Sequence, residues 1–199
     1  MNLRFMAVCC VLGVGSLAAI GQMGQGVAQP PAAGTMVSPA KAIDAQLSII
    51  EEEMMGAVKA MPAEKFGFAP SAAIFAPGQT TAFATVRTFA EQATHVAEAN
   101  YFFYSAVSGL KPDVDVRSLG KLTKKEDVVA ALAGSFAFGH KAIATVTRAN
   151  AVEVVKIEEP GLFTKATLAT FAVAHAFDHY GQMVEYLRMN GIVPPASAK

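Results

Sequence analysis

The chain has 199 residues, of which 53% are hydrophobic, and a domain of this length can bury a core of its own. Its formal net charge is zero, and the sequence contains no basic stripe and no polybasic run. These features exclude the electrostatic footprint of a nucleic-acid-binding protein, so we expect no nucleic acid as a partner.

The first 28 residues have the composition of a secretory signal peptide. Arg4 supplies a positive charge, an apolar run extends from Phe5 to Ile20, and small residues follow up to Ala28. The alternative is a transmembrane anchor, but a spanning helix needs about 20 apolar residues and this run is shorter. We therefore predict cleavage after Ala28, export to the periplasm or out of the cell, and no membrane attachment of the mature protein.

Both cysteines, Cys9 and Cys10, lie inside the segment that cleavage would remove. The mature protein would then contain no disulfide, no thiolate nucleophile and no thiolate metal ligand.

The folded domain is predicted to span residues 39–197, after a proline- and alanine-rich flexible lead-in at residues 29–38. Ser38 and Pro39 are typical of a helix start, because serine accepts a bond from a free amide and proline fits the first turn. Pro62 ends the helix. Between these points apolar residues recur at spacings of three and four: Ile43, Leu47, Ile50, Met54, Ala57 and Met61.

Residues 62–82 contain three prolines and two glycines, which predicts a long ordered loop. Connections of this length often form a wall of a site. A second helix is predicted from Thr85 to Ser108, with Gly109 and Pro112 as its stop signal.

A third helix is predicted from a capping box at Thr123 and Glu126 to about Arg148. Two glycines inside it, Gly134 and Gly139, cost helix propensity and indicate close packing. The β-prone residues that follow, 152–157, have no partner segment of similar kind, and we interpret them as a connection.

A fourth helix is predicted from Thr164 to Asn190, where Gly191 and the prolines after it prevent continuation. Four long helices predict an all-α protein with the architecture of a four-helix bundle. The connections are long, so a crossover topology is allowed and a simple up-down-up-down order is not required.

Two histidines lie four residues apart on the fourth predicted helix. His175 and His179 differ by about 40° around the helix axis, so both imidazoles can address one point. Buried imidazoles need partners, which ordinary hydrogen bonds or a shared metal ion would supply. By spacing, the pair belongs to a row that should face the core: Leu168, Phe171, His175, His179, Gln182 and Tyr186.

A third histidine, His95, lies in the middle of the second predicted helix and favours the metal interpretation. Three imidazoles from two helices can bind a divalent transition-metal ion and leave coordination positions open for water or substrate. The remaining histidine, His140, falls in an apolar row of the third predicted helix. We interpret it as a core or rim residue rather than as a ligand.

Two acidic residues adjoin these histidines. Asp178 points about 100° away from His179, which is typical of a surface group or of one that supports a ligand. Glu98 follows His95 by one helical turn, and we interpret it as a solvated residue, with a general base as the alternative. Ala176 stands where the zincin motif H-E-x-x-H requires glutamate, which excludes that protease class.

Two segments, FAEQATHVAEANYFFYSAV at 89–107 and HAFDHYGQMVEYLRMNGIVPPAS at 175–197, resemble the DinB-like (DinB/YfiT) superfamily of four-helix bundles. The resemblance extends over about residues 40–197. It implies a bundle of up-down-down-up order, a divalent metal ion held by His95, His175 and His179, and dimer formation as in many members.

The same resemblance implies several activities. Some relatives are thiol-dependent S-transferases or isomerases, a few resemble metal-dependent hydrolases, and many have no known activity. Thiol-dependent relatives use cytosolic thiols, so the predicted signal peptide weakens the transferase assignment.

Two functions therefore remain open: a metal-dependent hydrolase or transferase acting on an unknown small molecule, and a non-catalytic bundle stabilised by metal. The three histidines do not distinguish nickel, zinc and manganese. Neutral imidazole binds metal, so occupancy should fall below about pH 6.5. In the enzyme, Gln182 or Tyr186 would contact the substrate or a water molecule, and the alternative is that both are polar groups at the solvated end of the bundle.

Overall fold

The computed structural model describes residues 30–79, 86–158 and 160–198. The chain separates into two compact units, Met1–Thr35 and Met36–Lys199. The predicted signal peptide, residues 1–28, lies outside the described residues. In the described part of the first unit, the Thr35 amide donates to the Ala32 carbonyl and closes a turn. Of the helices that the structure describes, none is both long and apolar enough to cross a bilayer.

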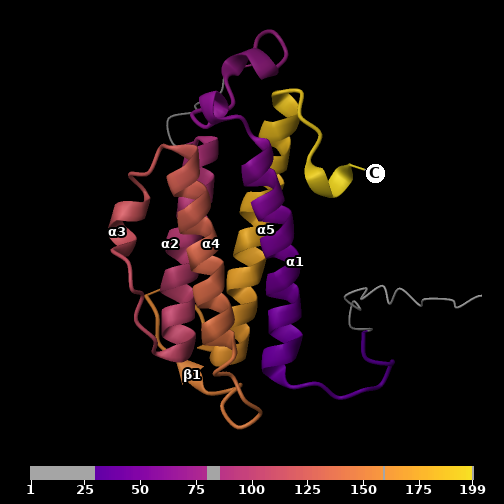
Figure 1. Ribbon diagram of the computed structural model, residues 1–199, viewed down its shortest axis with the longest axis vertical. Helices are drawn as coiled ribbons and strands as arrows, with labels where there is room; N and C mark the ends of the chain where they lie inside the picture. The colour runs from indigo at the N-terminus through magenta and orange to yellow at the C-terminus, as the bar shows by residue number, and fades with distance from the viewer. Residues whose placement is uncertain (1–29, 80–85, 159, 199) are drawn as a thin grey trace, which may run out of the picture. The chain divides into compact units, whose positions relative to one another are not determined.

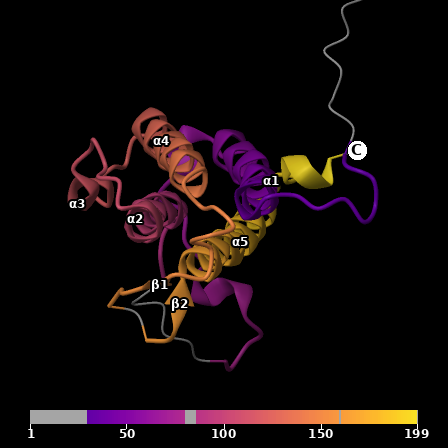
Figure 2. The ribbon, with the colours of Figure 1, turned by 90° about the horizontal axis from the view of Figure 1, so that it is seen from below.

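The second unit is a bundle of four long helices, as predicted. These are α1 (Pro39–Ala60), α2 (Phe89–Ser108), α4 (Lys125–Ile143) and α5 (Lys165–Met189). α1 and α5 run in one direction and α2 and α4 in the other (Figure 1), which is the up-down-down-up order. Viewed along the bundle (Figure 2), each long helix packs mainly against two others, so that α2 lies between α4 and α5.

The first and last helices begin where the sequence predicts. The Ser38 side chain accepts a hydrogen bond from the Lys41 amide ahead of Pro39 in α1. Thr164 precedes α5 and forms a capping box with Thr167. In both cases a local side-chain contact satisfies the free amides of the first turn, so the helix start is encoded within a few residues.

Helix α2 begins at Phe89, four residues after the predicted start at Thr85. Thr88 and Glu91 form a reciprocal capping box, in which the Glu91 carboxylate accepts from the Thr88 amide at 2.7 Å. This box sets the start, because the residue before a helix must be extended to bond the free amides.

The predicted bounds of α4 are wrong at both ends. Residues up to Leu122 are held in the turn that follows α3 (Val116–Leu119), so the helix begins at Lys125 and the predicted capping box does not form. At the other end, the Asn150 side chain accepts from the Thr147 amide and donates to the Thr145 carbonyl. This turn satisfies backbone groups that a helix continued to Arg148 would have used.

A two-residue antiparallel pair joins β1 (Val154–Val155) to β2 (Phe163–Thr164). The interpretation of residues 152–157 as a connection without a strand partner is therefore wrong. The partner immediately precedes α5 and is too short to produce a periodic pattern. α3 was missed for the same reason, since it has four residues.

The core lies between the four helices, and its largest members are fully buried. The predicted close packing at Gly139 is confirmed, because a Cβ atom there would lie 2.8 Å from the Tyr104 ring. One buried hydrogen bond, from Asn100 to Ser135 at 3.1 Å, joins α2 to α4. The buried apolar side chains include Leu47, Ile50, Met54, Phe89, Val96, Tyr104, Leu132, Phe136, Ile143, Leu168, Met183 and Leu187.

The described part of the loop between α1 and α2, residues 62–79, is ordered against the bundle. It contains the short 3-10 helices Ala63–Lys65 and Ala72–Ile74. Phe66 is buried and meets Phe89 edge to face at 5.5 Å between ring centroids. The loop therefore seals one end of the bundle at the start of α2.

His140 joins α4 to α1. Its two ring nitrogens lie 2.5 Å from an Asp44 carboxylate oxygen and 2.9 Å from a Glu51 oxygen. Burial alone would lower the pKa of His140, but the hydrogen bonds and charges of the two carboxylates outweigh it and raise the pKa. This agrees with the interpretation of His140 as a rim residue.

A raised pKa in the folded protein means that His140 stabilises the fold while it is protonated. The contribution is complete below the unfolded value of about 6.5 and is lost as the pH rises through the folded pKa. Replacing His140 with glutamine should therefore lower the free energy of unfolding by about 1 kcal/mol at pH 6 and by less at pH 9. Urea unfolding at the two pH values measures this, with Lys141→Gln as the exposed control. A loss that is equal at both pH values would contradict the ion-pair account.

Candidate metal centre

Three of the four histidines meet between α2 and α5. Ring centroids are 4.7 Å apart for His95 and His179, 5.1 Å for His95 and His175, and 4.5 Å for His175 and His179. One nitrogen from each ring lies within 4.8 Å of the other two. The antiparallel contact of α2 with α5 thus brings together residues 80 or more positions apart in the sequence.

The row of α5 that was predicted to face the core is buried at three of its six positions. Leu168, His179 and Tyr186 are buried, His175 and Gln182 are partly buried, and Phe171 is 40% exposed. The prediction is wrong for Phe171. The buried face of α5 also contains small residues, which allow neighbouring helices to approach closely: Ala169, Ala172 and Ala176.

A buried glutamine positions His179. The Nδ1 atom of His179 lies 2.6 Å from Oε1 of Gln92, which is 2% exposed. The Gln92 amide nitrogen donates to Oε1 of Gln182 at 2.8 Å, and the Gln182 amide nitrogen donates to the Asp178 carboxylate at 3.1 Å. A continuous hydrogen-bonded chain therefore leads from the Asp178 carboxylate to the imidazole of His179.

The carboxylate sets the direction of this chain, because it can only accept hydrogen bonds when ionised. The Gln182 amide group must turn its nitrogen toward Asp178. The Gln92 amide group must then turn its nitrogen toward Gln182 and its oxygen toward His179. Nδ1 of His179 then carries the proton, and its Nε2 presents a lone pair toward His175, whose Nε2 lies 3.2 Å away. This orientation is the one that a metal-binding imidazole requires.

Burial keeps two of the histidines neutral. It lowers the pKa of His95 to about 4, and the charges of Arg87, His179 and His175 act in the same direction. Burial also lowers the pKa of His179 to about 4, with His175 and Arg87 acting in the same direction and Asp178 opposing them. The ordinary pKa of about 6.5, on which the expected pH dependence of metal occupancy was based, therefore does not apply to these groups.

Two cavities open beside His95. One, of about 350 Å³, is lined by Arg87 and Thr94 among others, and the other, of about 590 Å³, by Phe102 and His175 among others. Glu98 lines both. The histidine cluster is thus accessible from two sides along α2.

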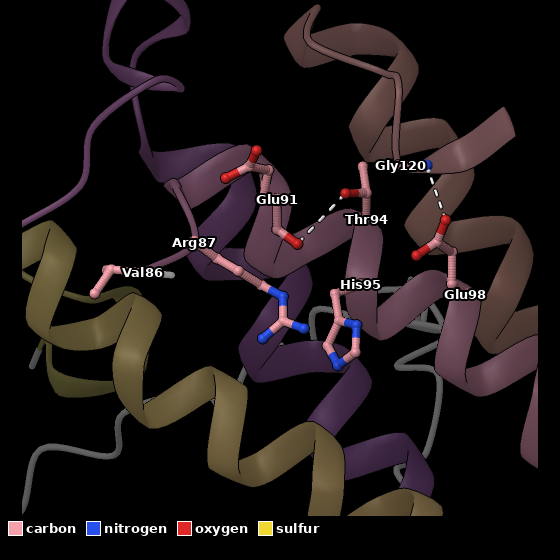
Figure 3. Close-up of a pocket in the computed structure, with 7 residues that line it drawn as sticks. All are labelled: Val86, Arg87, Glu91, Thr94, His95, Glu98 and Gly120. Atoms are coloured by element: carbon pink, nitrogen blue, oxygen red, sulfur yellow. Dashed lines mark hydrogen bonds between the residues drawn. The ribbon is translucent and has the colours of Figure 1, made fainter. Parts of the chain in front are cut away.

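Glu98 is partly buried, and its Oε1 accepts a hydrogen bond from the Gly120 amide at 3.0 Å (Figure 3). Glu98 is therefore only partly solvated, because Gly120, just after α3, packs against its carboxylate. Val116 and Arg117 of α3 and Gly120 just after it line the cavities. The predicted wall, residues 62–82, contributes none of its described residues to either one.

Two residues expected to contact substrate have partners within the protein. Gln182 bonds to both Gln92 and Asp178, and the Tyr186 hydroxyl donates to the Arg87 carbonyl at 3.1 Å. Gln182 therefore lies behind His179 rather than beside a substrate. Asp178 is exposed and supports a histidine at a distance, in agreement with its sequence interpretation.

Sequence reasoning missed the supporting role of Gln92 and the position of Arg87. Gln92 precedes His95 by three residues on the buried face of α2, and a polar residue at such a position was the available signal. Arg87 precedes α2 and gives no periodic signal. Its guanidinium points toward the His95 ring (Figure 3).

The model of the DinB superfamily matches residues 46–183. The chain belongs to the DinB superfamily. Its fold is also similar to that of a DinB-like protein from Bacillus cereus, known from a crystal structure, with a TM-score of 0.62 and 15% sequence identity. The similarity covers 78% of this chain and 95% of the other. No curated protein matches the chain.

The donor set of this DinB-like protein fits a divalent transition-metal ion. Imidazole nitrogens suit zinc and nickel, and the three rings each offer one within 4.8 Å of the others. His95 and His179 are neutral at pH 7, which is the metal-binding form. Together, the family and the cluster support a metal-binding protein.

The hydrogen-bonded chain from Asp178 can be tested on metal-free protein. At pH 6, where a histidine with an ordinary pKa is largely protonated, His179 should be neutral with its proton on Nδ1, and it should titrate near pH 4. Long-range ¹H–¹⁵N correlation spectra report both the charge and the tautomer. Replacing Gln92 with leucine should mix the two tautomers, whereas Gln46→Leu at an exposed site should not. A neutral His179 with its proton on Nε2 would contradict the proposed direction of the chain.

Proposed function

We propose that this DinB-like protein is an exported enzyme that binds one divalent metal ion through His95, His175 and His179 and transforms a small molecule. The observation that carries the proposal is the opening of two cavities onto His95. A metal ion that only stabilised the bundle would not need access from either side. Cavities of this size are typical of small-molecule sites.

The ligand set supports an open site. Within the described residues, the group close enough to share an ion contains three histidines and no carboxylate. Catalytic zinc sites have three protein ligands, whereas structural sites have four. Positions would therefore remain for water or a substrate oxygen.

When bound, the ion would supply a Lewis acid that polarises a substrate oxygen and lowers the pKa of water. The protein would contribute the remaining steps. The side-chain oxygen of Gln92 orients His179, and the Glu98 carboxylate, on the wall shared by the cavities, would accept the proton that an attacking water molecule releases. The guanidinium of Arg87, beside His95, would bind and orient an anionic group of the substrate.

Hydrolysis is favoured over thiol transfer. A mature chain cut after Ala28 has no cysteine, and the low-molecular-weight thiols used by thiol-dependent relatives are cytosolic. Water is available in the compartment to which the protein would be exported, and as a co-substrate it needs no second binding site.

A second function, a non-catalytic bundle, is supported by the position of the histidines. An ion between α2 and α5 would cross-link two helices that the bundle already packs together. In that case it would add stability and no turnover.

His175→Ala tests the metal site that both functions require. After dialysis against zinc, nickel or manganese in turn, the wild type should hold about one ion per chain and the variant none, because removing a ligand from a three-histidine site abolishes tight binding. His140→Gln, outside the cluster, is the matched control and should bind like the wild type. Metal content is measured by emission spectrometry.

The enzyme proposal requires, in addition, that metal-loaded wild type hydrolyse members of an ester, amide and lactone panel and that His175→Ala lose this activity. A loaded wild type that gains thermal stability but turns over no panel member would favour the non-catalytic function. A wild type that binds no ion would contradict both.

Export is supported by the charge, the apolar run and the small residues of the first 28 positions. Full-length protein made in a Gram-negative host should appear in the periplasm with Gln29 as its first residue. Intact-mass measurement of that fraction tests this, and Ala28→Arg should block cleavage because the position must be small. A full-length protein in the cytoplasm would contradict export.

A further inference from the structure

The two cavities beside His95 differ in chemistry. The first is polar and contains Arg87, Thr94 and Glu98, while the second contains Phe102, Phe103 and Phe171. The two cavities share His95 and Glu98, so one ligand can occupy both cavities with its middle part beside the histidine cluster.

The first cavity is lined by one cation, Arg87, and two carboxylates, Glu91 and Glu98. Arg87 is exposed and points toward His95 (Figure 3), and no ion pair among the described residues involves it. The two carboxylates accept hydrogen bonds from backbone amides rather than from Arg87. Glu91 caps its own helix through the Thr88 amide, and Glu98 accepts from the Gly120 amide. A guanidinium in this setting matches a carboxylate, which it can bind through two parallel hydrogen bonds.

The second cavity presents aromatic rings to solvent. Phe102 is 44% exposed and Phe171 is 40% exposed. Both contact the buried Phe103 at 5.3 Å between centroids, and Phe103 contacts His175 at 5.7 Å. The rings therefore form a continuous apolar surface that ends at the histidine cluster. An apolar group placed there would remove this surface from water, which is favourable.

The spacing of the two regions sets the form of the ligand. Phe102 lies seven residues beyond His95 on α2, about 10 Å along the helix axis. Arg87 lies on the opposite side of His95, ahead of the helix. A ligand that reaches both has its anionic group at one end, its apolar group at the other and its central atoms beside the histidines.

We propose that the substrate class is a small organic carboxylate with an aromatic or alkyl tail, its carboxylate bound by Arg87 and its tail packed on Phe102, Phe103 and Phe171. This inference rests on the proposed function, because it places the reacting bond beside His95. It adds that charge selects one end of the substrate and apolar contact the other.

The test uses the mature chain and simple probes: 4-phenylbutyrate, the uncharged 4-phenylbutanol of the same skeleton, and butyrate. Binding is measured by chemical-shift titration on protein dialysed against a chelator, so the result does not depend on metal. Metal content is measured separately. Failure of the probes to bind and failure of the protein to hold an ion are therefore distinguishable.

The acid should bind at least tenfold more tightly than the alcohol, and butyrate more weakly than either, because each loses one of the two contacts. Arg87→Gln should weaken the acid about tenfold or more and leave the alcohol unchanged. Phe171→Ala and Phe102→Ala should weaken acid and alcohol equally. All of these side chains are at least partly exposed, and circular dichroism checks that each variant is folded.

Arg148→Gln is the matched control, because Arg148 is exposed and lines neither cavity. It should leave the acid's affinity unchanged. Equal binding of acid and alcohol, an acid affinity unaffected by Arg87→Gln, or a loss in Arg148→Gln as large as that in Arg87→Gln would each overturn the proposal.

Discussion

The hydrogen bond between His179 and Gln92 is the interaction on which the arrangement of the site depends. Both side chains are almost fully buried, and each would be costly to bury without a partner. The bond joins α5 to α2 at 2.6 Å, and the Asp178 carboxylate fixes its direction through Gln182. One exposed charge therefore determines which nitrogen of a buried imidazole faces the other two histidines.

The order of the helices determines where this can happen. In the up-down-down-up arrangement α2 and α5 are antiparallel neighbours, so a histidine midway along α2 meets a histidine pair on α5 (Figure 1). Small buried residues of α5, including Ala172 and Ala176, allow close approach of the neighbouring helices. The cluster is buried enough to keep imidazoles neutral and open enough to meet a ligand. On either side of it along α2, the surface changes from cationic at Arg87 to aromatic at Phe102.

The features that the sequence predicted are those with a local physical cause. Ser38 and Pro39 act on the adjacent turn, and a pair of histidines four residues apart shares a helix face in any helix. Gly139 indicated close packing because its helix-propensity cost needs compensation from a neighbour. His95 was grouped with His175 and His179 because the helices that carry these three histidines belong to a recognisable four-helix bundle.

The features that were missed depend on contacts between distant segments. β1 and β2 form only because each provides the other with partners, and neither has a pattern of its own. Glu98 accepts a hydrogen bond from Gly120, which lies 22 residues away in the sequence. Gln182 turns toward Gln92, which lies 90 residues away. Residues 62–82 have the composition of a wall, but Phe66 packs against the end of the bundle while residues 116–120 line the cavities. The composition of residues 62–82 indicated an ordered loop, but it could not show which face of the bundle the loop packs against.

X-ray absorption spectroscopy of the zinc-loaded mature protein tests whether the three histidines form an open metal centre. We expect three imidazole nitrogens at about 2.0–2.1 Å and at least one oxygen neighbour that a small anion displaces. His95→Ala should remove the bound zinc, and His140→Gln should leave the spectrum unchanged. Zinc surrounded by four or more protein ligands with no exchangeable neighbour, or bound equally well without His95, would contradict an open three-histidine centre.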